Sequence, residues 1–261
     1  MLVGTSTKMN LTSTETAAYL DTLVPLLEAT DGIERCDVFV LPPFTSIWVA
    51  RERLQGTRVA WGAQDVHPDD AGAHTGDVSA PMLADLGCTY VECGHSERRR
   101  DHGETDDLIA RKVDAILRHG MRPVLCVGEP SRGPADAAGA FATGQLERDL
   151  AGVAPADLER VVVAYEPGWA IGAGSTPAAP SHVGAVHRAI HAWLAARRTA
   201  SGSADLPDGA RTRVIYGGSV DPIATPALLA EPAVDGLFVG RSALDPRRFA
   251  SIVELAARAG T

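Results

Sequence analysis

Eight short runs of apolar and β-branched residues recur along the chain, spaced by roughly 30 residues, about the length of one strand–helix unit. The runs are continuous rather than alternating, which is typical of strands in a parallel sheet because helices cover both of its faces. Amphipathic stretches between them, such as 105–119 and 181–198, predict helices. The predicted strands lie within residues 2–3, 37–41, 58–61, 89–93, 122–127, 161–165, 213–216 and 236–239.

Eight strands that alternate with helices predict a (β/α)8 barrel that occupies residues 1–261 as a single domain. A doubly wound open sheet is the alternative, because the same alternation also builds that fold. Residues 197–213 depart from the rhythm: the stretch 199–210 is rich in small and turn-forming residues and predicts an extended surface loop. We expect no chemistry from it.

Composition and charge narrow the class of protein. The chain has 261 residues, of which 45% are hydrophobic and 22% charged, as in an ordinary globular protein. Its net charge of −9 argues against a nucleic-acid or membrane surface as partner, although one small anion can still bind to a few local donors. We expect no export signal and no membrane-spanning helix, since the first residues lack the pattern of a signal peptide and no run approaches the roughly 18 apolar residues that span a membrane. With four cysteines and no C-x-x-C pair, we expect a cytoplasmic protein with reduced thiols.

Chemistry in a barrel of this kind collects in the loops that follow the carboxyl ends of the strands. Polar and glycine-containing segments stand at five such places: residues 5–10, 94–99, 166–176, 217–220 and 240–243. A single histidine, lysine, glutamate or Gly-Gly pair at one of them has an ordinary structural explanation. Their joint placement at the same end of the barrel favours one functional site.

The residues at these strand ends are chemically coherent. Glycine turns after the seventh and eighth strands, each preceding a helix, offer backbone amides to a phosphate dianion, and Gly172 and Gly174 add further amides. Lys8, His95 and Glu166 would then converge near that phosphate. A cation, an imidazole and a carboxylate suit proton abstraction beside a carbonyl, with Lys8 and His95 stabilising the enediolate oxygen.

Motifs in these segments resemble those of the triosephosphate isomerase family, in order from residue 2 to about residue 255. The resemblance implies the TIM-barrel form of the (β/α)8 fold, interconversion of dihydroxyacetone phosphate and glyceraldehyde 3-phosphate, and no metal or organic cofactor. The motifs are Lys8-Met9-Asn10, Gly94-His95-Ser96-Glu97-Arg98-Arg99, Ala164-Tyr165-Glu166-Pro167, Trp169-Ala170-Ile171-Gly172 and Tyr216-Gly217-Gly218-Ser219-Val220.

The resemblance also implies residue roles. Glu166 corresponds to the base that removes the carbon-bound proton. His95 corresponds to the neutral electrophile, whose pKa a helix N-terminus lowers in that family, and residues 96–97 are expected to open such a helix here. Lys8 corresponds to the cation that stabilises the enediolate and binds substrate, and Glu97 to the carboxylate beside it.

The family's phosphate clamp and lid also have counterparts. The clamp corresponds to Gly172, Ser219 and Gly240. Closure of the lid excludes water and protects the enediolate. Ser175 stands in its last hinge region, where the family carries a lysine, and this change is expected to alter hinge kinetics without touching the chemistry. The lid residues are Pro167, Gly168, Trp169, Ala170, Ile171, Gly172, Ala173, Gly174, Ser175 and Thr176.

Two departures from the family pattern bear on the substrate. Ser6-Thr7-Lys8 stands where Asn-Trp-Lys is usual, so Ser6 removes an amide and side-chain volume near the substrate. Gly240-Arg241 replaces Gly-Gly, and Arg241 either adds a cation near the phosphate or points into solvent. Together with residues 235–243, these features are similar to the L-erythrulose-1-phosphate isomerases of bacterial tetritol catabolism, although that branch keeps a tryptophan where Thr7 stands.

Both substrates therefore stay open: a triose phosphate, or L-erythrulose 1-phosphate converted to D-erythrulose 4-phosphate, whose extra hydroxymethyl group the smaller Ser6 would accommodate. In either reading the ligand is a small phosphorylated ketose or aldose. A non-catalytic phosphate-binding barrel is disfavoured because Lys8, His95 and Glu166 are all present. The segment Gln64–Asp77, including Thr75-Gly76-Asp77, resembles the family's dimer-forming third loop and predicts a homodimer.

Overall fold

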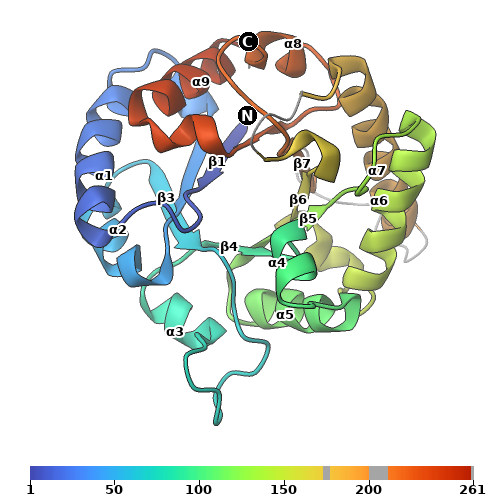
Figure 1. Ribbon diagram of the computed structural model, residues 1–261, viewed down its shortest axis with the longest axis horizontal. Coiled ribbons are helices and arrows are strands. Elements are labelled where there is room, and N and C mark those ends of the chain that lie inside the picture. Colours follow the sequence, from blue (N-terminus) through green and yellow to red (C-terminus); the bar gives the residue numbers. More distant parts are fainter. Residues whose placement is uncertain (173–176, 200–210, 260–261) are drawn as a thin grey trace.

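Eight parallel strands close into one barrel in chain order (Figure 1), in a computed structural model that describes residues 1–172, 177–199 and 211–259. β8 pairs with β1, with Leu2 opposite Gly236, and completes the ring. The predicted (β/α)8 barrel is therefore confirmed, and the open doubly wound sheet is wrong. The strands are β1 Leu2–Ser6, β2 Asp37–Leu41, β3 Val59–Ala63, β4 Tyr90–Cys93, β5 Arg122–Val127, β6 Val162–Tyr165, β7 Arg213–Tyr216 and β8 Gly236–Val239.

Helices surround the barrel (Figure 1). Their starts follow local sequence: Thr105, for example, caps α5 by accepting a hydrogen bond from the N–H of Leu108. α7 continues to Thr199, so the first residues of the predicted loop 197–213 are helical, while residues 200–210 lie outside the described residues. The α-helices are α1 Ser13–Glu28, α2 Ile47–Leu54, α3 Ala80–Asp85, α4 Ser96–Asp101, α5 Asp106–Arg118, α6 Ala135–Asp149, α7 Pro180–Thr199, α8 Thr225–Leu229 and α9 Pro246–Ala259.

Short 3-10 turns complete the connections, and none of the described helices is both long and apolar enough to cross a membrane. The segment between β3 and α3 projects away from the barrel (Figure 1), and its residues 70–77 are exposed. This projecting segment, residues 64–79, contains the whole of the predicted third loop. The 3-10 turns are η1 Ile33–Arg35, η2 Phe44–Ser46, η3 Pro155–Arg160, η4 Gly168–Ala170 and η5 Arg241–Leu244.

Side chains alternate along each strand between two cores, one inside the barrel and one between the barrel and its helices. At the carboxyl end the inward positions turn polar, since Ser6 and Glu92 each follow an inward-facing residue by two positions. The apolar layer therefore closes the floor of the barrel, and the polar residues form its mouth. The inner core contains Leu2, Phe39, Leu41, Val124, Cys126, Val162, Ala164, Ile215 and Phe238.

A buried group of charges joins the projecting segment to the helices after β4. Lys112 on α5 is 3% exposed and donates to Asp65 and Glu104 at 2.6 Å each. Arg98 on α4 contacts the same two carboxylates, at 2.8 and 2.5 Å. Because each buried charge has a partner, the group fixes α4 against the segment that follows β3.

Gln64 ties together the loops that follow the first three strands. Its side-chain amide donates to the carbonyl oxygen of Leu41 at 2.9 Å and to that of Lys8 at 3.2 Å. The same amide lies 3.4 Å from the hydroxyl of Thr7. One side chain thus holds the backbone around Lys8 in place.

Candidate active site

A cavity of about 670 Å³ opens at the carboxyl ends of the strands, within the range of roughly 300–1,000 Å³ that is typical of small-molecule sites. Its wall comes from the loops after β1, β4, β6, β7 and β8, where the sequence predicted the site. The wall includes the predicted catalytic residues Lys8, His95, Glu97 and Glu166, and the predicted binding residues Ser6, Gly172, Ser219, Gly240 and Arg241.

Lys8 is held in a strained backbone conformation, with a φ of 50°, which no other non-glycine residue in the described ranges shares. Such a residue costs roughly 1–2 kcal/mol, and here the hydrogen bond from Gln64 restrains it. The ammonium group donates to Oε1 of Glu97 at 2.7 Å. Burial lowers the pKa of Lys8, but the Glu97 hydrogen bond and the charge of Glu166 outweigh it and raise the pKa above its ordinary value. Lys8 is therefore a fixed cation.

His95 presents a neutral N–H to the cavity. It caps α4, as the predicted helix at residues 96–97 requires, and its Nδ1 accepts the N–H of Glu97 at 3.1 Å. The ring proton consequently lies on Nε2, which is 3.4 Å from Nζ of Lys8. Burial and then the charge of Lys8 lower the pKa of His95 to about 4, so the ring is uncharged at neutral pH.

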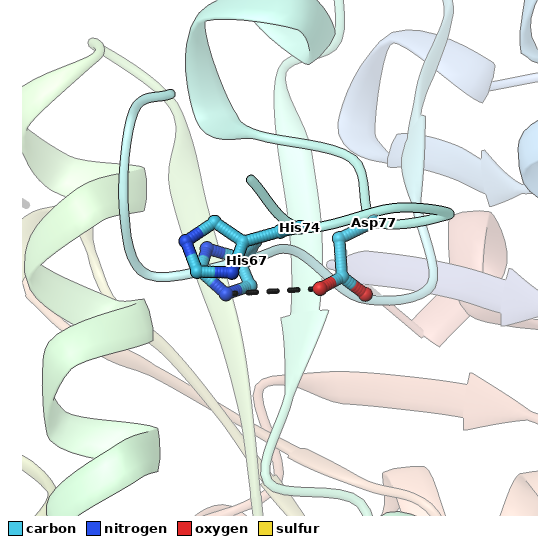
Figure 2. A group of neighbouring side chains, drawn as sticks. All are labelled: His67, His74 and Asp77. Atoms are coloured by element: carbon cyan, nitrogen blue, oxygen red, sulfur yellow. Dashed lines mark ion pairs between the residues drawn. The ribbon is translucent and has the colours of Figure 1, made fainter. Parts of the chain in front are cut away.

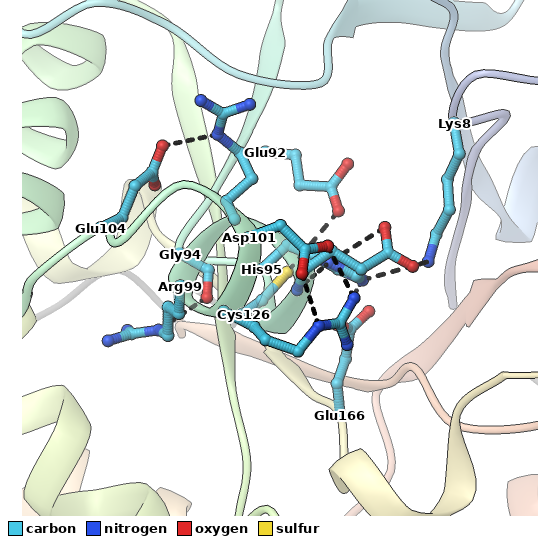
Figure 3. Close-up of polar contacts among 12 residues, drawn as sticks. Lys8, Glu92, Gly94, His95, Arg99, Asp101, Glu104, Cys126 and Glu166 are labelled. Carbon is cyan, nitrogen blue, oxygen red and sulfur yellow. Dashed lines mark hydrogen bonds and ion pairs between the residues drawn. The ribbon is translucent and has the colours of Figure 1, made fainter.

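Glu166 faces His95 at the end of β6 (Figure 3), with Oε2 of Glu166 3.2 Å from Nε2 of His95. Oε2 is buried and has no hydrogen-bond donor of suitable geometry among the described residues. Burial, followed by the negative charge of Glu92, raises the pKa of Glu166 well above its ordinary value. This carboxylate is thus a much stronger base than one in water.

The Lys8–Glu97 contact sets the balance of charge at the mouth of the cavity. Burial pushes the pKa of Glu97 upward, but the hydrogen bond from Lys8 and the charge of Lys8 lower it overall. Glu97 therefore remains a carboxylate beside a cation. The pair leaves Lys8 anchored at one side while its ammonium group still borders the cavity.

Glycine turns and a cation form the other side of the cavity. Gly240 is followed at once by η5 rather than by an α-helix, and after β7 the helix α8 begins only at Thr225. The expected α-helix N-termini are therefore not directly at these turns. Arg241 lines the cavity, and no carboxylate in the described ranges pairs with it. A guanidinium group beside glycine turns suits an anion.

The start of the predicted lid is fixed by several contacts. Trp169 in η4 donates from Nε1 to Glu129 at 2.7 Å, and the guanidinium of Arg132 stacks over its ring at 5.0 Å. Ser219 donates from its backbone N–H and its hydroxyl to the carbonyl of Ala170, at 3.0 and 2.9 Å. Ser219 therefore borders both the lid and the cavity. The predicted lid residues 173–176 lie outside the described residues.

Glu92 is a cavity residue that the sequence does not single out, because it lies inside an apolar run that predicts a strand. It is 3% exposed and lines the cavity. The thiol of Cys126 approaches Oε1 of Glu92 at 3.9 Å, and the Ser6 hydroxyl donates to the same carboxyl group. Burial raises the pKa of Glu92 to about 7, against the effect of Ser6. A charged residue in an otherwise apolar strand was the available signal.

A second group of polar side chains lies in the projecting segment (Figure 2), where His67, His74 and Asp77 place one possible ligand atom each within 4.8 Å of one another. Nδ1 of His67 accepts the N–H of Asp69, so the proton lies on Nε2, which faces Asp77 at 3.7 Å. A metal ion needs the lone pair of a deprotonated nitrogen. This arrangement therefore fits a hydrogen-bonded turn better than a metal site, and none of the three borders the cavity.

Known proteins resemble this chain along its whole length. The profile of the family described as "Triosephosphate isomerase" matches residues 1–256. The triosephosphate isomerase of Aquifex aeolicus (strain VF5) is 41% identical over 254 residues, which is 97% of this chain and 98% of the relative. That of Roseiflexus sp. (strain RS-1) is 44% identical over 230 residues, or 87% of each chain.

A relative with a different name is equally similar. The L-erythrulose-1-phosphate isomerase of Rhizobium meliloti (strain 1021) is 40% identical over 259 residues, which covers 98% of this chain and 97% of the relative. Overall sequence identity therefore does not distinguish triosephosphate isomerases from the L-erythrulose-1-phosphate isomerase as relatives of this chain. The residues that line the cavity are the place to look for a difference in substrate.

Proposed function

The chain belongs to the triosephosphate isomerase family, and from this we propose that it moves a carbonyl between adjacent carbons of a small phosphorylated ketose or aldose. The family reaction, interconversion of dihydroxyacetone phosphate and glyceraldehyde 3-phosphate, is the first candidate. The observation that carries the proposal is the convergence of a buried base and a neutral N–H donor, Glu166 and His95, 3.2 Å apart beside Lys8.

Glu166 takes the proton from the carbon next to the carbonyl group, and its raised pKa makes this transfer less uphill. The electron pair moves onto the carbonyl oxygen, which the Nε2–H of His95 and the ammonium group of Lys8 stabilise as an enediolate. Protonated Glu166 then gives its proton to the former carbonyl carbon. The hydroxyl proton on the other carbon passes to the first oxygen by way of His95, which donates its Nε2 proton and takes this one in return. The new carbonyl forms on the carbon from which Glu166 took the proton. Atoms balance without an oxidant, metal or organic cofactor.

The phosphate group binds at the opposite side of the cavity. Gly172, Ser219 and Gly240 line this side of the cavity, and the guanidinium of Arg241 adds a positive charge. Closure of the lid over the bound substrate excludes water from the enediolate. The contacts that hold Trp169 and Ala170 fix the first part of that lid.

A four-carbon substrate is the second candidate, and Ser6 is the observation that favours it. Its short side chain borders the cavity where the family usually carries asparagine, and so leaves room beside the reacting carbon. L-Erythrulose 1-phosphate is dihydroxyacetone phosphate with one added hydroxymethyl group. The same base and donor would convert it to D-erythrulose 4-phosphate.

Steady-state kinetics on one enzyme preparation test both candidates. We expect measurable kcat/KM for glyceraldehyde 3-phosphate, erythrulose 1-phosphate or both, and the ratio identifies the preferred substrate. Ser6→Asn should move that ratio toward the triose phosphate, because it refills the space. Absence of turnover with both substrates would overturn the proposed function.

We also propose that 1–261 acts as one domain and forms a homodimer through Gln64–Asp77. The exposed residues 70–77 and the exposed apolar side chains of Met9, Phe44 and Met82, which follow three neighbouring strands, support a face that a second copy covers. Met82→Arg should weaken the dimer in sedimentation experiments, whereas Ile223→Arg, exposed after β7, should not. A fully active monomer contradicts this proposal.

We also propose that the protein is located in the cytoplasm. All four cysteines are free thiols, which suits a reducing compartment. The net charge of −9 supports a small-molecule substrate rather than a nucleic-acid or membrane partner. Fractionation of cells that express the chain tests the location directly.

A further inference from the structure

Two side chains of the cavity take no direct part in the proposed proton transfers, and they contact each other. Ser6 at the end of β1 and Glu92 on β4 are 7% and 3% exposed, and both line the cavity. The Ser6 hydroxyl donates a hydrogen bond to the Glu92 carboxyl group. Glu166 already supplies the base and Glu97 already pairs with Lys8, so Glu92 is a surplus carboxyl group.

Glu92 has unused capacity for hydrogen bonds. Besides Ser6, the thiol of Cys126 approaches it at 3.9 Å, and no cation in the described ranges lies within ion-pair distance. An ionised carboxylate has roughly four acceptor positions, and two weak donors do not fill them. Burying such a group is unfavourable unless it gains partners, so a carboxyl group that borders a ligand cavity has its natural partner in the ligand.

The position of Glu92 identifies which part of the ligand it can contact. In the closed eight-stranded ring β4 lies diametrically opposite β8, whose end carries Gly240 and Arg241. A carboxylate repels a phosphate dianion, so the phosphate belongs on the β8 side. Glu92 therefore borders the end of the substrate remote from the phosphate, next to the reacting carbons and Glu166.

We propose that Glu92 and Ser6 form a subsite for a hydroxyl group that lies beyond the reacting carbon, and so select a ketose phosphate one hydroxymethyl group longer than a triose phosphate. The substrate hydroxyl donates to the Glu92 carboxylate, and the Ser6 hydroxyl keeps its own hydrogen bond to that carboxylate and so holds it in place. A triose phosphate has no group that reaches this subsite. The inference rests on the proposed isomerase function and specifies its substrate class.

Three substrates test the subsite: erythrulose 1-phosphate, its 4-deoxy analogue, 3-hydroxy-2-oxobutyl phosphate, and dihydroxyacetone phosphate. For the wild type we expect kcat/KM for erythrulose 1-phosphate to exceed that for the 4-deoxy analogue by roughly 10- to 100-fold, the usual range for a hydrogen bond to a charged group. Glu92→Leu should reduce this preference to within about threefold. Glu92→Gln, which keeps an acceptor, should restore part of it.

Tyr90→Phe is the matched control, since Tyr90 faces inward on the same strand below the cavity, and it should keep the preference. Equal loss on erythrulose 1-phosphate and on its 4-deoxy analogue in Glu92→Leu would show that Glu92 acts only through Glu166, and overturns the subsite. The subsite is also overturned if the wild type converts dihydroxyacetone phosphate and neither of the other two substrates. Turnover of none of the three instead overturns the proposed function itself.

Discussion

Nε2 of His95 lies 3.2 Å from Oε2 of Glu166, and each side chain is 6% exposed. An N–H donor and a base at this distance can act on the oxygen and the adjacent carbon of one substrate molecule. Because the pKa of His95 is lowered to about 4 while that of Glu166 is raised, the ring stays neutral and the carboxyl group accepts a proton more readily. The two opposite shifts make an acid–base pair of the two residues.

Glu166→Gln should remove turnover and leave binding. Glutamine keeps the size of the side chain but cannot accept the proton, so we expect kcat to fall by about 10³-fold. KM and inhibition by inorganic phosphate should change by less than about threefold, since the phosphate binds at the other side of the cavity. Steady-state kinetics measure both quantities, and near wild-type kcat in this variant contradicts the assigned mechanism.

Glu92→Gln should move the acid limb of the pH profile of kcat/KM to lower pH. That limb reports the pKa of the free base, and the charge of Glu92 helps to raise the pKa of Glu166. Without that charge the pKa of Glu166 falls, and the acid limb of the profile moves to lower pH with it. Glu28→Gln, an exposed carboxyl group on α1, should leave the profile unchanged. A limb that stays in place in both variants shows that Glu166 does not control it.

The same variant should change the pH dependence of stability. Glu92 has a pKa of about 7 when folded and an ordinary value of 4.5. Below pH 4.5 both states hold the proton and stability is complete; between 4.5 and 7 the unfolded chain releases its proton first, so stability falls as pH rises. Glutamine does not titrate, so the free energy of unfolding of Glu92→Gln should not show this fall. The difference in that free energy between the variant and the wild type should therefore shift in favour of the variant by up to roughly 3 kcal/mol between pH 4 and pH 8. Urea unfolding at both pH values measures this, and an equal difference at both is the contrary result.

Gly217→Ala should impair the base without unfolding the barrel. A Cβ at this position would stand 2.6 Å from Cγ of Glu166, so the carboxyl group must shift. Displacement of a reacting group by about 1 Å costs on the order of 10²-fold in rate, and we expect kcat to fall accordingly. Gly144→Ala in α6 is the control, because its Cβ would meet nothing closer than 3.5 Å. Equal kcat in both variants would show that Glu166 accommodates the methyl group.

Lys112→Met should lower the free energy of unfolding more than the substitution Arg111→Met at the preceding residue. It removes the cation from two buried carboxylates, Asp65 and Glu104, and an unpaired buried charge costs about 3–5 kcal/mol. Arg111→Met breaks an exposed pair with Asp69 and should cost at most about 1 kcal/mol. Denaturant unfolding of both variants gives the comparison. Similar losses would mean that the buried group relaxes or admits water.

Much of the architecture follows from the sequence, because apolar runs and helical periodicity mark the strands and helices directly. The parallel barrel then places every strand's carboxyl end at one rim, so Lys8, His95 and Glu166 could be predicted to lie together. Short turns could not be predicted as well: η5 differs from the start of an α-helix by a single hydrogen-bonding step. Elements that repeat a pattern over many residues can therefore be predicted, whereas a turn of three or four residues cannot.

Contacts between side chains far apart in the sequence were also beyond prediction. Lys112 reaches Asp65 across 47 positions, and neither residue carries a local signal of that pairing. In the sequence Glu92 is one polar residue in a buried strand, and only the fold brings the Ser6 hydroxyl to it. Such pairs depend on where two strands or helices meet, which periodicity does not specify.

Gln64 has a consequence for exchanging loops between related barrels. Its amide donates to the carbonyl oxygens of Lys8 and Leu41, so the residue that opens the projecting segment also restrains the strained backbone of the predicted catalytic cation. A graft of that segment from another chain would therefore import part of the active site with it. The loop after β3 is not a modular unit, and engineering that treats it as one will alter the chemistry as well as the surface.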